Sequence, residues 1–257
     1  MKKSNEEIKS IVTDAINKRK IVSFVTFLLS DYGEKELNLI LRTILERFDR
    51  VDLLDIAYTS AKELILNATK ANLKRMLFRR LSLDIENPQD YETGMNYFKS
   101  HISEDKLKTY KADFRKYDLP VTATFYYSPD VLNIKVKNNF KLLDHEESRI
   151  RDKFGKAKSF ASLLDFFVEH GDSTEGAGMG LTMVGILLDQ SGIDKHSFIL
   201  YNAEKYGETA AKLEIPLARD YISKRKMFEI EMNEKGITAE ELRKTFSYNY
   251  KDFGVWN

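Results

Sequence analysis

The chain has 257 residues, 42% hydrophobic and 32% charged, which suffices for one large core beneath a highly charged surface. A net charge of +1 argues against a dedicated nucleic-acid binder, which neutralises phosphates with surplus Lys and Arg. Cysteine is absent, which excludes disulfides and thiolate metal sites. The N-terminal lysines precede no apolar segment, and the longest apolar run, residues 21–29, is shorter than the about 20 residues of a membrane span. We therefore expect a cytoplasmic protein that binds neither nucleic acid nor a membrane.

The first 49 residues predict an N-terminal extension of helices with one ambiguous segment. Apolar residues at helical spacing predict packing helices over residues 5–18 and 34–47. Residues 21–29 are rich in β-branched and aromatic side chains, which favours a strand. A buried helix is the alternative, because periodicity does not separate the two in so short an apolar run.

Residues 52–80 predict one long helix with two distinct stripes. Small and apolar residues form the first stripe, which allows a sheet or a ligand to approach closely: Ala57, Ala61, Leu64, Ala68 and Ala71. Polar residues form an adjacent stripe: Glu63, Asn67, Lys70 and Lys74. Since Glu63 and Asn67 are four residues apart, their carboxylate and carboxamide lie on one helix face. This polar stripe fits either a binding site or a solvated face.

The middle of the chain predicts a charged helical insertion over residues 82–118, followed by two strands. These strands, residues 121–127 and 132–137, are joined by Ser-Pro-Asp, which favours a turn. The remaining predicted elements are helices over 146–153, 159–170 and 181–190 and a closing hairpin of 197–201 and 210–216. This order predicts an α+β sandwich in which helices cover one face of a mixed sheet.

A glycine-rich segment, Gly176-Ala-Gly-Met-Gly-Leu-Thr-Met-Val184, leads directly into the apolar helix over 181–190. Such a turn exposes backbone N–H groups beside a helix N-terminus, where an anion is stabilised. Together with Glu63 and Asn67, it predicts a magnesium–triphosphate site. Ser173 and Thr174 precede the turn and fit either a contact to the terminal phosphate or simple solvation of the loop.

Residues 50–218 resemble the ATP-binding domain of sensor histidine kinases, anti-sigma serine kinases, type II topoisomerases and heat-shock chaperones, the histidine-kinase-like (GHKL) ATPase family. Glu63-Leu-Ile-Leu-Asn-Ala-Thr-Lys70 resembles the family's N box, and Tyr206–Pro216 is similar to its terminal hairpin. The resemblance implies that Asn67 binds Mg²⁺, that Lys70 contacts phosphate and that Glu63 is the catalytic base. It also implies ATP contacts from the second glycine box, carried here by Thr174, Gly176, Gly178, Gly180 and Leu181.

The adenine motif of this family is altered. Asn138 stands where the family has the Asp that holds the adenine amino group, and Phe140 replaces the first glycine. An Asn can still accept a hydrogen bond from an adenine N–H and donate one to a ring nitrogen. Phe140 either narrows the pocket or stacks in it. Residues 149–154, Arg-Ile-Arg-Asp-Lys-Phe, still resemble the Arg-Ile-Phe-x-x-Phe run of histidine kinases.

The resemblance predicts a cytoplasmic protein kinase or ATPase that uses ATP and Mg²⁺ and acts on a partner protein. None of the four histidines begins a long dimerising helix, so we expect the phospho-acceptor, His or Ser, on the partner. The alternatives are a catalytically inactive nucleotide sensor or scaffold, and a protein that shares only the fold.

A C-terminal extension, residues 219–257, lies beyond the predicted ATP-binding domain. Its Thr238-Ala-Glu-Glu241 segment predicts a capping box that opens a helix. The final residues are rich in aromatic side chains, which either pack on the domain or contact a partner. Self-association through this tail or the N-terminal helices would give a homodimer.

Overall fold

The structure, a computed structural model, describes residues 2–148 and 179–246, and the statements below concern these residues. Its helices are α1 (Asn5–Asn17), α2 (Asp31–Arg47), α3 (Leu54–Arg80), α4 (Pro88–His101), α5 (Glu104–Thr109), α6 (Lys111–Lys116), α9 (Met179–Gln190), α10 (Lys224–Lys235) and α11 (Ala239–Thr245). Its strands are β1 (Val22–Thr26), β2 (Val121–Tyr127), β3 (Val131–Asn138), β4 (Phe198–Ala203) and β5 (Glu208–Pro216). Short 3₁₀ turns, η1 (Val51–Leu53), η2 (Lys195–Ser197) and η3 (Glu204–Tyr206), complete the fold.

The strands form one five-stranded sheet in the order β1-β2-β3-β5-β4, in which every neighbouring pair of described strands is antiparallel. The prediction of a mixed sheet was therefore wrong. Short turns join β2 to β3 and β4 to β5, and such hairpins permit only antiparallel pairing. β3 and β4 do run in the same direction, but β5 lies between them, so these two parallel strands never pair.

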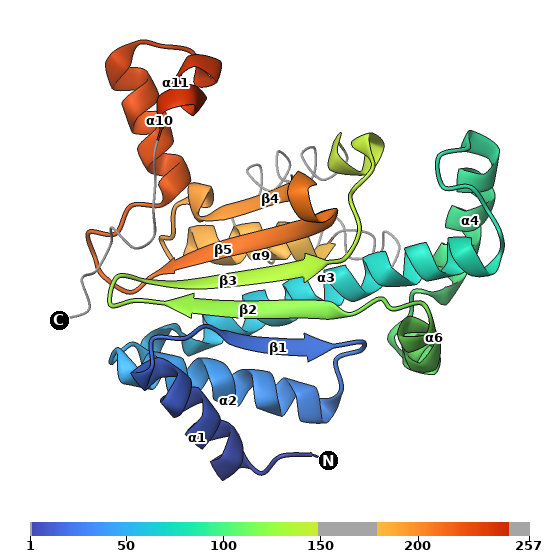
Figure 1. Cartoon of the computed structure of the whole chain (residues 1–257), viewed down its shortest axis with the longest axis horizontal. Helices are drawn as coiled ribbons and strands as arrows, with labels where there is room; N and C mark the ends of the chain where they lie inside the picture. The colour runs from blue at the N-terminus through green and yellow to red at the C-terminus, as the bar shows by residue number, and fades with distance from the viewer. Residues whose placement is uncertain (1, 149–178, 247–257) are drawn as a thin grey trace.

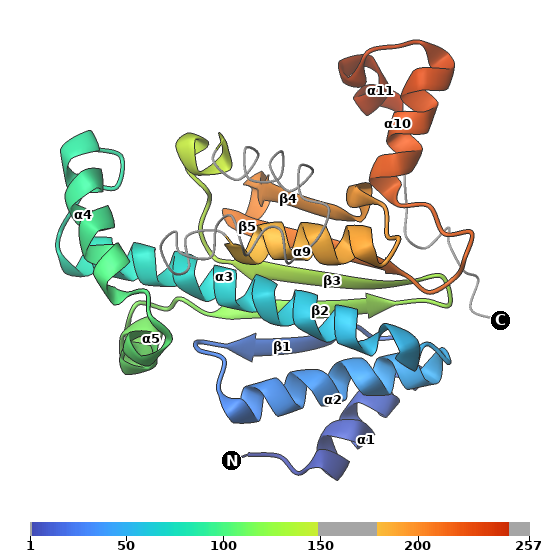
Figure 2. The same ribbon diagram turned by 180° about the vertical axis from the view of Figure 1, so that it is seen from behind.

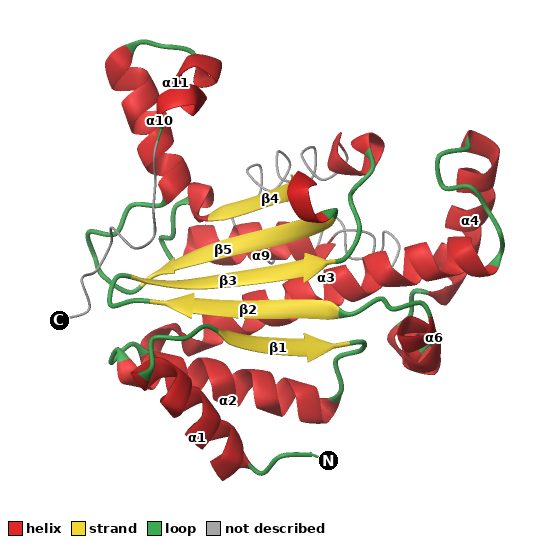
Figure 3. Cartoon of the chain, viewed as in Figure 1, coloured by secondary structure: helices red, strands yellow, loops and turns green. Residues whose placement is uncertain are grey.

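The molecule has two layers, with α2, α3 and α9 covering one face of the sheet (Figures 1 and 2). Figure 3 shows the strands together in one layer. Side chains of alternate strand positions, such as Phe24, Phe125, Ile134 and Leu213, meet the helices in the main core. Four residues of the small-residue stripe of α3 lie in the same core, Ala57, Ala61, Leu64 and Ala68, which explains how this long helix approaches the sheet so closely.

The N-terminal residues belong to this same folded unit. The ambiguous segment 21–29 contains the edge strand β1, which pairs with β2, and α1 and α2 supply side chains to the main core. At the other end of the chain, the capping box predicted at Thr238 and Glu241 is present at the start of α11. No helix among the described residues is both long and apolar enough to cross a bilayer.

The predicted insertion forms α4, α5 and α6 and has a second, smaller core beside the C-terminal half of α3. The buried residues of this core are Leu73, Met76, Leu77, Phe98, Ile102, Leu107, Tyr110, Phe114 and Leu119. The insertion therefore packs on the C-terminal part of the same helix whose middle carries the candidate site residues (Figure 1).

Gly94 in α4 is needed for the close contact between α4 and α3. A Cβ atom added at this position would collide with the ring of Phe78, which is buried. Gly94→Ala should therefore destabilise the protein by about 1–3 kcal/mol, the usual cost of overpacking, although Ala is the better helix former. Thermal unfolding measures this change. Asn96→Ala, at an exposed position of the same helix, is the control, and a Gly94→Ala protein that melts above the wild type would contradict this packing.

Candidate functional site

The candidate site begins with two polar side chains of α3, Glu63 and Asn67. Glu63 and Asn67 are half-buried and lie one turn apart, on a helix that packs beside α9. Burial raises the pKa of the Glu63 carboxyl, an effect that the positive charges of Lys70 and Lys62 oppose. Within the described residues, Glu63 makes no ion pair or hydrogen bond. A partly buried carboxyl group with a raised pKa is a candidate general base.

Asn67 carries an unsatisfied polar atom. Its Nδ2 is buried and has no hydrogen-bond partner among the described residues. Leaving such a donor unpaired costs roughly 1–3 kcal/mol, so an acceptor from a ligand would stabilise it. A bound triphosphate offers oxygen acceptors, and the Asn67 carboxamide oxygen would remain for a magnesium ion, which prefers oxygen ligands and retains several waters.

In the described part of the chain, no group of three or more His, Cys, Asp or Glu side chains could hold a metal ion. The residues present fit a Mg²⁺ ion carried by a nucleotide, for which one amide oxygen is sufficient, and not a metal held by protein ligands alone.

Lys70 follows Asn67 by one turn and is half-buried. Its charge acts on Glu63, which places both groups on one region of the helix surface. Glu63, Asn67 and Lys70 therefore lie at neighbouring turns of α3, and the roles that the sequence predicted for them stay predictions.

The last residues of the glycine-rich segment, from Met179 on, form the start of α9. α9 packs alongside α3 (Figure 2). Since α9 leads through η2 into the start of β4, its first turn, with Gly180 and Leu181, points toward the end of the sheet where β3 ends at Asn138. The other predicted contacts of this segment, Ser173, Thr174, Gly176 and Gly178, lie outside the described residues.

Asn138 is buried at the end of β3 and is bound to α3. Its Nδ2 donates to the Ala68 carbonyl oxygen at 2.9 Å and to the Asn72 Oδ1 at 2.7 Å. Asn72, fully buried in α3, in turn donates from its Nδ2 to the carbonyl oxygen of Leu119 at 2.6 Å. Both N–H groups of Asn138 are thus used inside the protein, and only the carboxamide oxygen remains for a ligand.

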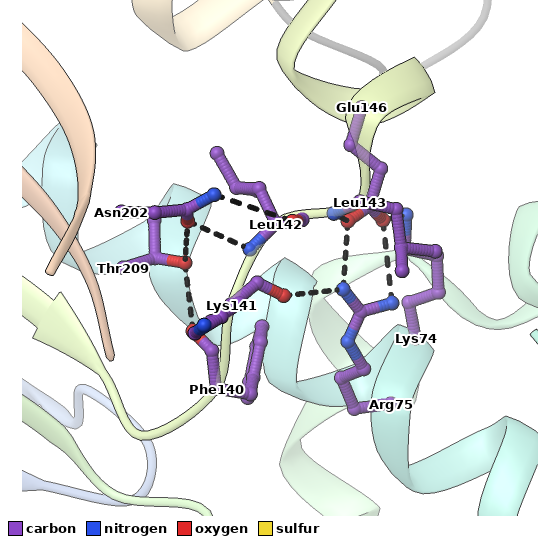
Figure 4. Close-up of polar contacts among 9 residues, drawn as sticks. All are labelled: Lys74, Arg75, Phe140, Lys141, Leu142, Leu143, Glu146, Asn202 and Thr209. Carbon is purple, nitrogen blue, oxygen red and sulfur yellow. Dashed lines mark hydrogen bonds and ion pairs between the residues drawn. The ribbon is translucent and has the colours of Figure 1, made fainter. Parts of the chain in front are cut away.

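The Phe140 side chain packs against the smaller core formed with the insertion. The Arg75 guanidinium lies 4.8 Å from the centre of its ring. The segment that follows is tied down by the polar contacts drawn in Figure 4. The Phe140 carbonyl oxygen accepts from Thr209 Oγ1 at 2.7 Å, and the Leu142 N–H donates to Asn202 Oδ1 at 2.9 Å. Phe140 and the residues after it are thus held by contacts with α3, β4 and β5.

Glu146, at the end of this segment, belongs to a buried ion-pair cluster (Figure 4). Its carboxylate binds Lys74 and Arg75 of α3 and accepts from the Leu143 N–H at 3.0 Å, and Arg75 also donates to the Lys141 carbonyl oxygen at 3.0 Å. Burial lowers the pKa of Arg75 to about 10, which leaves the guanidinium protonated at neutral pH. These contacts fix the segment 140–146 to α3.

Sequence reasoning missed Asn72, Arg75 and Glu146. Asn72 could have been found, because it is a polar residue that continues the apolar stripe four positions after Ala68. Arg75 and Glu146 had no comparable signal, since they meet only through tertiary structure.

Two cavities in the structure lie away from these residues. A cavity of about 600 Å³ lies between α10, α11 and the edge of the sheet, lined among others by Ile199, Phe228 and Phe246. A second, of about 450 Å³, is lined by Arg50, Ser197 and Lys226, near the end of the sheet opposite Asn138. Neither includes Glu63, Asn67 or Asn138, and the predicted nucleotide site also involves residues outside the described part.

Comparison with known proteins identifies one relative of unassigned function. The chain is 29% identical over 205 residues to an uncharacterized protein of Treponema pallidum (strain Nichols), a match that covers 80% of this chain and 39% of that protein. The chain thus spans about two fifths of the length of this relative. No protein-family model matches the chain, and no solved structure matches it.

Proposed function

We propose that this protein binds ATP with Mg²⁺ in the manner of the histidine-kinase-like family and acts as a cytoplasmic signalling kinase or ATPase on a separate partner protein. The observation that supports this most directly is the pair on α3. Glu63 is a half-buried carboxyl with a raised pKa, and Asn67 carries a buried N–H without an acceptor. Both features cost stability in the free protein, and a ligand between α3 and the start of α9 would account for both.

Each residue has a defined task in this proposal. Asn67 would hold Mg²⁺ through its carboxamide oxygen, and the ion would neutralise developing charge on the phosphates. Lys70 would bind a phosphate oxygen. Glu63 would take a proton from water or from the acceptor hydroxyl of a partner protein. Backbone N–H groups of the glycine-rich segment would bind the phosphates at the N-terminus of α9.

A catalytically inactive sensor is the second candidate, and the adenine side of the site favours it. Asn138 is neutral, and Phe140 and the Glu146 cluster hold the following segment rigidly. A sensor of this kind would bind a nucleotide without turning it over.

Titration of ATP into the protein by calorimetry, with and without Mg²⁺, tests the proposal. We expect binding that requires the metal. If neither ATP nor ADP binds at millimolar concentration, the enzyme and the sensor are both excluded.

Replacing Glu63 with Gln should separate catalysis from stability. We expect phosphate release or phosphotransfer to fall by roughly 100-fold or more, the usual contribution of a general base, with ATP affinity little changed. Because burial raises the pKa of Glu63 in the folded state, the stability that this group contributes is full at low pH and is lost as the pH rises through that pKa. Glu63→Gln should therefore raise the melting temperature at pH 7, and this gain should shrink on acidification.

Asp55→Asn, an exposed change on the same helix, is the matched control for both measurements. Equal turnover by the wild type and Glu63→Gln would remove Glu63 from the mechanism. A wild-type protein that binds Mg²⁺ and ATP without any turnover, even with its partner present, would favour the sensor.

A further inference from the structure

We infer that the groove between α10, α11 and β4 is a docking site for an acidic segment of a partner protein, a segment that also carries a large apolar or aromatic side chain. The groove holds the cavity of about 600 Å³, and its lining includes Ile199, Arg225, Phe228, Met232 and Arg243. None of its described lining residues belongs to the candidate nucleotide site. The inference therefore adds a surface for a partner to the proposed function and does not depend on it.

The groove lies on the side of the sheet that α2, α3 and α9 leave uncovered. In β4, Phe198 and Leu200 contact the main core, so the alternation of side chains along a strand directs Ile199 to the other face. Ile199 lines the groove together with residues of α10 and α11. In Figures 1 and 2 these two helices project beyond the sheet and the helices that cover it. The groove is therefore separate from the main core.

The apolar surface of α10 is incompletely buried. This helix carries four large apolar side chains, Met227, Phe228, Ile230 and Met232, and none of them is fully buried. Phe228 and Met232 line the groove, and the ring of Phe228 meets that of Phe246 edge to face, with 5.0 Å between the ring centres. An apolar side chain of a ligand would be removed from water by contact with these groups.

The two carboxylates among the described lining residues already have partners. Glu214 forms an ion pair with the Lys212 Nζ at 2.5 Å. Glu229 forms one with the Lys226 Nζ at 2.9 Å and also lies 3.3 Å from the His196 Nε2. The negative charges of the groove are therefore engaged within the protein.

The two arginines of the lining differ in this respect. Arg225 of α10 and Arg243 of α11 are exposed, and neither makes an ion pair with the residues that the structure describes. The first turn of α10 contains the consecutive cations Lys224, Arg225 and Lys226 and no acidic residue, although the positive end of a helix dipole favours an acidic one. The groove thus has surplus positive charge, which an acidic ligand would neutralise.

A buried lysine beside the groove responds to this surplus charge. Burial lowers the pKa of Lys212, and the positive charges of Lys224 and Lys135 also lower it, while Glu214 opposes them. Lys135 lies directly opposite Lys212 in the pairing of β3 with β5, and like charges at such positions are destabilising. A negative charge bound nearby would stabilise these cations.

The combined chemistry favours a segment of polypeptide as the ligand. Guanidinium groups bind carboxylates through two parallel hydrogen bonds, and Arg225 and Arg243 stand on different helices. A segment of chain can bring separate carboxylates to both arginines while an apolar side chain contacts Phe228 and Met232. Such a segment is complementary to the groove in charge and in hydrophobicity.

Selection from a library of random peptides tests this inference. The library is selected on the immobilised full-length protein, and peptides that also bind the double variant Arg225→Glu, Arg243→Glu are removed. We expect the remaining peptides to be rich in Asp and Glu and to share an aromatic or large aliphatic residue. Their affinity should fall as the salt concentration rises, because salt screens exposed charges.

Dissociation constants of the selected peptides separate the contributions of charge and apolar contact. Arg243→Glu should weaken binding by roughly tenfold or more, whereas Lys244→Glu, the same change of charge at an exposed neighbour outside the lining, should have little effect. Met232→Ala should weaken binding by roughly tenfold, whereas Met227→Ala, on the same helix but outside the lining, should not. Melting temperatures verify that each variant is folded.

Several results would overturn the inference. One is a selection that yields no peptide dependent on the two arginines, or only basic or uncharged peptides. A wild-type dimer that Arg243→Glu dissociates would assign the groove to a second copy of the chain. Trp256, the only tryptophan, lies outside the described residues; a shift in its emission in Arg243→Glu without added peptide would assign the groove to the chain's own C-terminal residues. Titration of ATP into the wild type decides the proposed function separately.

Discussion

Asn67→Ala is expected to weaken Mg²⁺-dependent ATP binding by roughly 10- to 100-fold while leaving the protein as stable as the wild type, or more so. In the proposed site, binding would fall because the carboxamide would supply both a metal ligand and a donor for phosphate. Stability does not fall, because the Asn67 Nδ2 is a buried donor without an acceptor, and Ala removes this group and is the better helix former. Calorimetry of ATP binding and thermal unfolding measure the two effects.

A loss of ATP affinity without a loss of stability would distinguish a binding residue from a structural one. A residue that serves the fold alone would lose stability on truncation, and a residue on a solvated face would change neither quantity. Thr59→Ala, two turns earlier on the same helix, controls for the general effect of an added Ala. An Asn67→Ala protein with unchanged ATP affinity would remove the metal ligand from the proposed site.

Much of the fold followed from local pattern. The long helix α3, the insertion, the β2–β3 hairpin and the capping box of α11 were all predicted from periodicity and turn chemistry. Residues 21–29 were ambiguous, because a strand buried on one face and a short buried helix have similar composition. Pairing with β2 decided for the strand.

What the sequence did not reveal depends on contacts between distant segments. The mixed sheet was a wrong prediction because the position of β5 between β3 and β4 is a property of the whole topology. The candidate site was predicted in its outline on α3, where Glu63, Asn67 and Lys70 follow at helical spacing. The hydrogen bonds of Asn138 to Asn72 and of Arg75 to Glu146 span 66 and 71 residues, and no local pattern encodes such pairs.

These distant contacts also change the meaning of the altered adenine motif. Read alone, Asn138 in place of Asp and Phe140 in place of Gly indicate a degenerate pocket. In the structure Asn138 is locked by two hydrogen bonds from its Nδ2, and Phe140 packs against a second core that α4, α5 and α6 supply. Asn138 and Phe140 therefore depend on contacts with α3 and the insertion, and we expect that restoring only one of the two family residues lowers the stability of the protein.

The sharpest case is Asn138→Asp, which recreates the residue of the family pattern and is nonetheless expected to lose about 3–5 kcal/mol of stability at pH 7. A carboxylate at this position would face the Ala68 carbonyl oxygen and the Asn72 Oδ1, two acceptors, in a buried site. Reversal of Asn72 would relieve one contact only by turning its oxygen toward the Leu119 carbonyl oxygen. Denaturant unfolding measures the loss, and we expect ATP affinity not to improve.

The pH dependence of this loss identifies its cause. Burial against two acceptors should raise the pKa of the new Asp in the folded state, so its destabilising effect is full at neutral pH and fades as the pH falls through that pKa. The protonated acid regains one donor, and the difference from wild type should narrow between pH 7 and pH 4. Asn139→Asp adds the same charge at an exposed neighbour and should cost little. Wild-type stability together with tighter ATP binding in Asn138→Asp would show that the hydrogen bonds from Asn138 to Ala68 and Asn72 do not constrain this position.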